Sequence, residues 1–362
     1  MSAEQRDPAL AALGEFGLIG RIRERVRVRH PGTLVGIGDD AALLGLEAGN
    51  RFLVTTDMLL EGVHFQWSWG CVRELGRKAV AVNVSDIAAM GGQPRYALLG
   101  VAIPPTGLSL GGLDALLAGM EEEAEVHGVT LVGGDTCASR SGLVLSVTLI
   151  GLPPDTGPIL RSGARPGDGV WVTGALGGAA GGLLALDGGF RPGAPWPATL
   201  ARPGWAGASE EAALRAALAA HLTPVPRVAA GRALAGRATA MIDVSDGVAS
   251  DAGHLAAESH LGLRIHAREL PIHPGATVAA RLAGRDALDL ALRGGEDYEL
   301  LFTAAAADAS RLQKALAEKS GTPARVIGRI LPAAEGIRLR YADGRIQSHE
   351  ALTGWDHFQE RK

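Results

Sequence analysis

Apolar runs of strand length alternate with amphipathic segments of helix length along most of this chain. RFLVTTD (51–57) and VTLVGGD (129–135) are predicted to be buried strands that each end in an acid, and LVLSVTLIG (143–151) a third strand. ELGRKAVAVNVSDIAAMGG (74–92) and LDALLAGMEEEAEVHG (113–128) have the spacing of helices that glycine terminates. This alternation predicts α/β layers, whose ligand sites lie beyond the carboxyl ends of strands.

The second half of the chain follows a segment rich in proline and glycine, residues 152–169. Beyond it, TAMIDVSDG (239–247) is predicted to be a strand leading into a helix with Ser245 or Asp246 near its N-cap. EDYELLFT (296–303) is predicted to be a further strand. A length of 362 residues suits two domains, for which we expect the bounds 1–152 and 153–362. The Pro- and Gly-rich residues 187–209 are expected to form a loop or insertion.

Composition excludes several classes of function. A formal net charge of −4 argues against a general nucleic-acid binder. The longest uncharged runs are broken by proline pairs short of a span of about 20 residues, so no membrane segment is expected. The two cysteines, Cys71 and Cys137, do not form a CxxC motif, and no signal peptide pattern opens the chain. A reducing, cytoplasmic location is expected.

Seven aspartates lie in five short patches that are otherwise apolar or rich in glycine. The patches are GIGDDAA (36–42), TTD (55–57), VSDIAAMGG (84–92), GGDT (133–136) and IDVSDG (242–247). A carboxylate in such surroundings is costly to desolvate unless a cation or donor compensates it. Carboxylates without paired His or Cys favour Mg²⁺ or Mn²⁺. The pattern therefore predicts one polyvalent cation site that binds a nucleotide or phosphate.

Each patch also has a simpler interpretation. Asp39 and Asp40 could face water in an exposed turn, and Asp86 could be a buried acid satisfied by protein donors. GGDT alone is a common turn, although its glycines would let backbone N–H groups approach a phosphate. In DVSDG the acids could merely cap the helix, whose N-terminus otherwise suits phosphate. GGEDYEL (294–300) could be a hairpin turn or could meet a cationic substrate group.

In chain order, the motifs resemble the thiamine-monophosphate kinase family, within the superfamily of aminoimidazole ribonucleotide synthetase-like ATP enzymes. The resemblance covers nearly the whole chain apart from 187–209 and the termini. Its motifs are GEFGLIGRI, GIGDDAA, TTDMLLEGVHF, KAVAVNVSDIAAMGG, LVGGDT, RSGARPGD, VTG, IDVSDGVASDAGH, GGEDYELLFT, IGRI and GWDHF. It implies two α/β (α+β) domains, each a mixed sheet with flanking helices, and a homodimer that pairs the N-terminal sheets.

The resemblance also implies ATP-dependent phosphorylation of thiamine monophosphate to thiamine diphosphate by in-line transfer across several Mg²⁺ ions, with no general base. The implied Mg²⁺ positions are Asp40, Thr55, Thr56, Asp57, Asp86, Asp135, Asp243 and Asp246. The implied nucleotide contacts are Thr56, Gly134, Asp135, Arg161 and Ser245. The implied substrate contacts are His64, Glu296 and Trp355. No role is implied for Cys137.

Two other classes of function stay open from the sequence. Another enzyme of the superfamily is the nearer one: an aminoimidazole ribonucleotide synthetase, a selenophosphate synthetase or a hydrogenase-maturation dehydratase. A selenophosphate synthetase would need a reactive Cys near its N-terminus, and the maturation enzyme a C-terminal Cys; here the first Cys is Cys71 and the chain ends HFQERK. A non-catalytic nucleotide-binding dimer is the other class, which the full set of acids disfavours.

Overall fold

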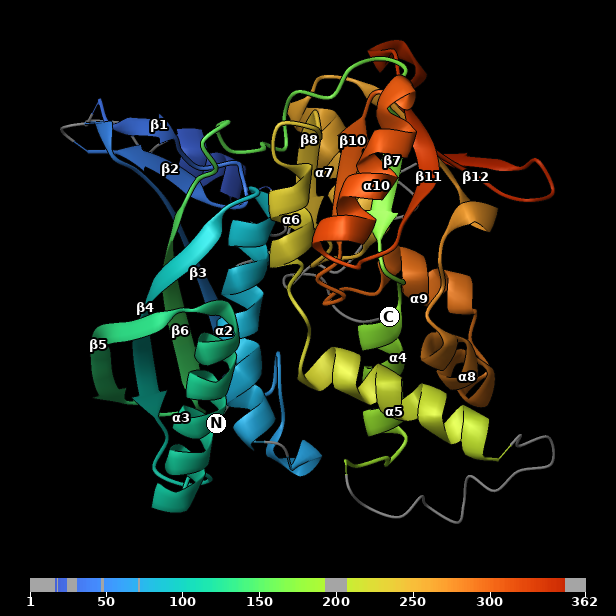
Figure 1. The fold of residues 1–362 in the computed structure, drawn as a ribbon. Helices are drawn as coiled ribbons and strands as arrows, with labels where there is room; N and C mark the ends of the chain where they lie inside the picture. The colour runs from blue at the N-terminus through green and yellow to red at the C-terminus, as the bar shows by residue number, and fades with distance from the viewer. Residues whose placement is uncertain are drawn as a thin grey trace.

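Two mixed β-sheets, one from each half of the chain, carry the helices on their faces (Figure 1). The structure, a computed structural model, describes residues 17, 19–24, 31–46, 49–70, 72–192 and 207–348. Within these residues, no helix is both long enough and apolar enough to cross a membrane.

The N-terminal sheet holds six strands among the described residues, in the order β1-β2-β3-β6-β4-β5. Neighbours are antiparallel except β4 and β5, which are parallel and joined by a helical crossover. The strands are β1 (Thr33–Val35), β2 (Ala42–Gly45), β3 (Arg51–Leu60), β4 (Gln93–Ile103), β5 (Thr130–Ala138) and β6 (Val144–Leu152). Helices α2 (Val72–Ala89) and α3 (Leu110–His127) pack together beside this sheet, after the short helix η2 (Trp67–Trp69).

The C-terminal sheet holds seven described strands in the order β13-β12-β9-β11-β7-β10-β8. They are β7 (Gly169–Thr173), β8 (Ala240–Asp243), β9 (Gly262–His266), β10 (Leu300–Ala304), β11 (Ala324–Leu331), β12 (Ile337–Arg340) and β13 (Ile346–Ser348). The helices are α4 (Gly178–Asp187), α5 (Ala208–Leu222), α6 (Val228–Leu234), α7 (Val248–Glu258), α8 (Pro274–Ala283), α9 (Ala287–Arg293) and α10 (Ala309–Lys319). Three single-turn helices complete it: η4 (Ala267–Glu269), η5 (Ala306–Asp308) and η6 (Ala333–Glu335).

Helix α2 lies between the two halves, against α3 and the first sheet on one side and against α6 and β8 on the other (Figure 1). Three glycines allow this close packing. A Cβ on Gly76 would meet the Leu116 carbonyl of α3, one on Gly119 would meet Arg73 of α2, and one on Gly231 would meet Ala88 of α2. Because backbone meets backbone at these crossings, α2 is wedged tightly at the domain boundary.

Two sequence predictions need correction. β5 is not buried: it is an edge strand, and eight of its nine residues are exposed. The strand predicted at 296–303 begins only at Leu300, since Glu296 and Tyr298 have positive φ angles of 67° and 49°, which interrupt extended pairing. Gly247 is the N-cap of helix α7, so Ser245 and Asp246 lie just before it, near the N-cap as predicted.

Candidate functional site

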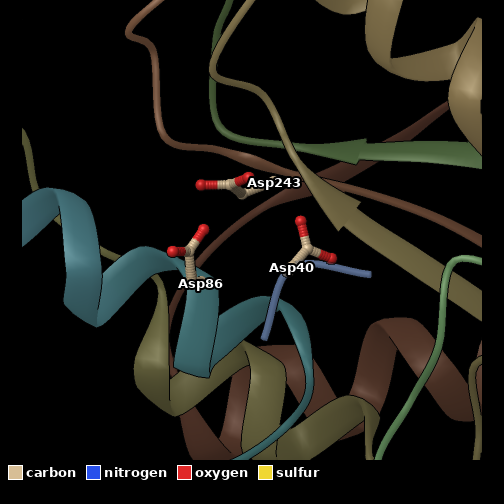
Figure 2. A group of neighbouring side chains, drawn as sticks. All are labelled: Asp40, Asp86 and Asp243. Atoms are coloured by element: carbon tan, nitrogen blue, oxygen red, sulfur yellow. The ribbon is translucent and has the colours of Figure 1, made fainter. Parts of the chain in front are cut away.

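Three of the predicted carboxylates converge at the domain boundary (Figure 2). Asp40 comes from the loop before β2, Asp86 from the last turn of α2, and Asp243 from the end of β8. One carboxylate oxygen of each lies within 4.8 Å of one from the other two. Such a trio of hard oxygen ligands, drawn from three segments and both sheets, matches what Mg²⁺ binds.

Neighbouring residues fix the orientation of these acids. The Thr55 hydroxyl on β3 donates a short hydrogen bond to Asp86 Oδ2, and Ser85 Oγ donates to Asp243 Oδ2 at 2.6 Å. On α2, Asn83 Oδ1 accepts the backbone N–H of Asp57 at 3.1 Å. The strand alternation of β3 therefore turns Thr55 and Asp57 toward α2.

The acids of this cluster carry pKa values that their surroundings raise. Burial, and after it the repulsion from Asp40, raises the pKa of Asp243 to about 8. Burial raises the pKa of Asp57 to about 6. Burial, followed by repulsion from Asp57 and Asp243, raises the pKa of Asp86 well above its ordinary value. Oδ2 of Asp40 is buried and has no hydrogen-bond partner among the described residues. Bound Mg²⁺ would compensate the buried negative charges and would give Asp40 Oδ2 a partner. The residues present therefore fit a divalent cation.

Arg161 joins the interdomain segment to this cluster. Its guanidinium donates to Asp40 Oδ1 at 2.8 Å, and its backbone N–H donates to Asp39 Oδ2 at 3.1 Å. Burial, and then repulsion from Asp40, raises the pKa of Asp39 to about 7. A cation on the second domain is thus held directly against the predicted metal-binding loop, where a phosphate would need it.

One acid of this region, Asp251 in the first turn of α7, is not among the residues predicted from the sequence. It is 1% exposed, and its Oδ2 has no hydrogen-bond partner in the part of the chain that the structure describes. Burial, followed by repulsion from Asp246 and Asp243, raises the pKa of Asp251 well above its ordinary value. The signal was present in IDVSDGVASD, where Asp251 lies on an apolar helix in the same way as Asp86.

Other predicted residues lie apart from the trio within this single chain. Asp57 pairs with Val147, which pairs in turn with Leu99, and Leu99 pairs with Gly134 of β5. Gly134 and Asp135 are therefore three strands from Asp57, about 14 Å at the usual strand spacing. Asp135 is exposed on the sheet edge, where its Oδ1 accepts the backbone N–H of Thr136.

Thr56 faces the opposite side of β3 from Thr55, and its hydroxyl donates to the Val147 carbonyl at 3.1 Å. Ser245 and Asp246 are half-buried in the turn between β8 and α7, next to Asp243. The Ser245 carbonyl accepts the backbone N–H of Glu296 at 2.7 Å. This bond joins the predicted nucleotide turn to the predicted substrate residue.

A pocket walled by aromatic rings lies at the other end of α2. Its lining includes His64, Trp67 and Trp69 from the first domain and His221 from the second. Nδ1 of His64 accepts the backbone N–H of Leu60 at 3.0 Å, which fixes the ring orientation. Lys78 completes the wall, and its Nζ lies 2.7 Å from Glu296 Oε1. His64 thus lines this pocket, and Glu296 contacts two of its lining residues, Lys78 and His221. Trp355 lies outside the described residues.

Asp297, the neighbour of Glu296, has a separate task. Its carboxylate accepts the backbone N–H groups of Gly177 and Ala179, at 2.5 and 3.0 Å, and so caps the N-terminus of α4. The glycine-rich turn that precedes α4 resembles a phosphate cradle, but the protein's own carboxylate occupies it. Asp297 is therefore part of the framework.

Comparisons with known proteins identify the family of this chain and its fold. The family models for AIR synthase related proteins match residues 38–152 (N-terminal domain) and 165–339 (C-terminal domain). Thiamine-monophosphate kinase of Salmonella typhimurium is 34% identical over 347 residues, 96% of this chain and 99% of that protein. A structure of AaThiL complexed with AMPPCP and TMP has a TM-score of 0.78 and 31% identity, covering 98% of this chain and 100% of the other. Thiamine-monophosphate kinase from Stenotrophomonas maltophilia has a TM-score of 0.70 and 39% identity, covering 91% and 97%.

The fold and its acidic interdomain site define a member of the AIR synthase related proteins. Within that class, identity above 30% over nearly the whole length decides the family. The chain belongs to the thiamine-monophosphate kinases. The expected family, the two-domain α/β fold and the enzyme class are confirmed.

Proposed function

We propose that this enzyme transfers the γ-phosphoryl group of ATP to thiamine monophosphate, forming thiamine diphosphate and ADP. The observation that carries the proposal is the trio Asp40, Asp86 and Asp243 at the boundary of the two domains. Two ligands named for a similar structure, the ATP analogue AMPPCP and TMP, support the identity of the two substrates.

The chemistry of the acceptor suits an acidic, base-poor site. A phosphate monoester is largely ionised near neutral pH, so its oxygen needs no strong general base to attack. The difficulty is that two polyanions must approach each other. Bound Mg²⁺ would neutralise the phosphates and hold them in line. The contribution of the chain is to fix the carboxylates: Thr55 orients Asp86, and Ser85 orients Asp243.

We assign the remaining residues by their position. Asp57 and Asp246 would extend the metal set beside the trio, together with Thr55, and Asp251 would add charge behind Asp246. Arg161 and Ser245 would meet the nucleotide's phosphates at the turn that Asp40 and Asp243 flank. His64 and Glu296 would contact the acceptor in the aromatic pocket.

A homodimer fits the exposed strand β5. Its outer edge, which no described strand pairs with, carries Asp135 and Gly134, and the Val132 side chain is 56% exposed. A long exposed edge strand is a template for pairing with another chain. Pairing with a second copy would cover it, and the nucleotide and metal roles of Thr56, Gly134 and Asp135 are proposed in that assembly.

The test is a product assay on the purified full-length protein with ATP, Mg²⁺ and three acceptors: thiamine monophosphate, thiamine and a simple phosphate monoester. We expect thiamine diphosphate to form, with thiamine a poor acceptor, because no general base is assigned among the described residues to activate its neutral hydroxyl. Equal or faster turnover of thiamine would contradict the proposal. So would the absence of thiamine diphosphate at saturating substrates.

A further inference from the structure

The aromatic pocket contains a buried cation with unused hydrogen-bonding capacity. Lys78 is 3% exposed, projects from α2 into the pocket wall, and forms an ion pair with Glu296 at 2.7 Å. Its Nζ is not aligned for a hydrogen bond to any group among the described residues. A buried ammonium with three N–H donors and one ionic contact is incompletely satisfied. Because Lys78 lines the pocket, the missing acceptor belongs to whatever fills that pocket.

Glu296 supplies the complementary acceptor beside Lys78. Burial opposes ionisation of Glu296, but Lys78 and then His221 outweigh it and lower its pKa below the ordinary value. The carboxylate is therefore ionised at neutral pH. Nδ1 of His221 lies 3.1 Å from Oε2, and the His221 ring packs edge-on against Trp69 with centroids 5.3 Å apart. Lys78 and His221 thus hold the Glu296 carboxylate from two sides. The backbone of Glu296 has a positive φ angle, which residues other than glycine seldom adopt.

A donor and an acceptor side by side match one edge of an aminopyrimidine. The ring nitrogen next to the amino group accepts a hydrogen bond, and the amino group donates one. We propose that Lys78 and Glu296 together recognise this edge of the acceptor substrate, with Lys78 donating to the ring nitrogen and Glu296 accepting from the amino group. Lys78 is then a specificity-determining residue of the phosphoryl acceptor site. This assignment rests on the proposed function.

The position of Lys78 along α2 agrees with the layout of such an acceptor. Lys78 precedes Asp86 by eight residues, which places the two on similar sides of the helix about 12 Å apart along its axis. Thiamine monophosphate carries its aminopyrimidine and its phosphate at opposite ends. With the phosphate near Asp86, the ring would reach the pocket at Lys78, whose lining includes Trp67 and Trp69.

The experiment compares two acceptors on the full-length enzyme with ATP and Mg²⁺: thiamine monophosphate and its 4-oxo analogue, oxythiamine monophosphate. The oxo group reverses both hydrogen bonds of the edge, since the ring N–H now donates and the oxygen accepts. The wild-type enzyme should prefer the amino form by about 100-fold or more in kcat/KM, because sites built around hydrogen bonds reject such mismatches strongly. Lys78→Met should raise the KM for thiamine monophosphate by about tenfold or more, leave the KM for ATP nearly unchanged, and reduce the preference by about tenfold.

The control is Arg73→Met, which removes a cation from the exposed side of the same helix, where Arg73 pairs with Glu122. It should alter neither the KM for thiamine monophosphate nor the preference. If folded Lys78→Met loses the same factor with both acceptors, Lys78 is only structural and the proposal fails. A wild-type enzyme that uses both acceptors equally overturns it without any variant. A wild-type enzyme inactive on thiamine monophosphate instead overturns the proposed function itself.

Discussion

Asp243 receives a hydrogen bond from Ser85 and faces the carboxylate of Asp86, the next residue on the same helix. A hydrogen bond and a charge repulsion thus both act between α2 and β8 across the domain boundary. In the absence of a cation, the Ser85 hydroxyl offsets only part of the repulsion, since the pKa of Asp243 is still raised to about 8 by burial and by Asp40. Arg161 offsets a further part of this repulsion, and the pKa of Asp243 that is still raised favours a bound cation at the boundary.

Replacing Asp86 by Asn should separate activity from folding. The variant keeps the size of the side chain but removes one shared charge of the trio, so kcat/KM should fall by about 100-fold or more. Unfolding of the metal-free protein should be no easier than in the wild type, because one buried repulsion is gone. Steady-state kinetics and denaturant unfolding measure the two effects. Asp289→Asn on α9, where the acid is 40% exposed, is the control; near-normal activity of Asp86→Asn would place Asp86 outside the metal site.

The raised pKa values predict how metal-free stability depends on pH. Asp57, Asp39 and Asp243, with pKa values of about 6, 7 and 8 in the folded chain against an ordinary 3.8, keep protons that the unfolded chain has lost. Between about pH 4 and 8 the folded state binds more protons, so its stability falls as pH rises. In EDTA, the melting temperature should drop by about 5 °C or more between pH 5 and 8.5.

Added Mg²⁺ should recover more of this loss at pH 8.5 than at pH 5, because the cation must displace the protons at low pH. Thermal scans with and without Mg²⁺ measure both effects. In Asp243→Asn, the melting temperature in EDTA should fall less between pH 5 and 8.5 than in the wild type. A melting temperature in EDTA that is flat or rises over this range would mean that the carboxylates are already compensated.

The exposed edge of β5 predicts where self-association occurs. Val132→Lys places a charge on that edge and should shift the protein toward monomer, as measured by sedimentation velocity. Val126→Lys is the matched control, since Val126 is 69% exposed but lies on α3. A wild-type protein that is monomeric at micromolar concentration, or a Val132→Lys dimer as tight as the wild type, would exclude β5 as the interface.

The trio could be anticipated from the sequence because each acid stands out against its neighbours. Asp40, Asp86 and Asp243 lie in apolar or glycine-rich segments, where solvation cannot explain a carboxylate. The same criterion, a carboxylate on an apolar helix, also selects Asp251. The sequence does not distinguish the roles of Glu296 and Asp297, since only the tertiary contacts show that Asp297 caps α4 while Glu296 contacts Lys78.

Residues whose partners lie far away in sequence could not be predicted from local pattern. Lys78 belongs to a helix with normal charge spacing, so its sequence suggests a solvated position, and its burial depends on Glu296 and His221 more than 140 residues away. The exposure of β5 could not be predicted from local pattern either. A run of Val, Leu and Gly predicts a buried strand, but whether a neighbouring strand covers it depends on the sheet order.

Besides its packing against α6 and β8, helix α2 has polar side-chain contacts with the second domain at two points, Ser85 near one end and Lys78 nearer the other. Ser85 contacts Asp243, and Lys78 contacts Glu296, which His221 also contacts. A ligand that bound at both points at once would hold the two domains together. Its binding free energy would then appear as interdomain docking energy. Calorimetry would detect this as a change from two unfolding transitions, or one broad transition, to a single sharper one.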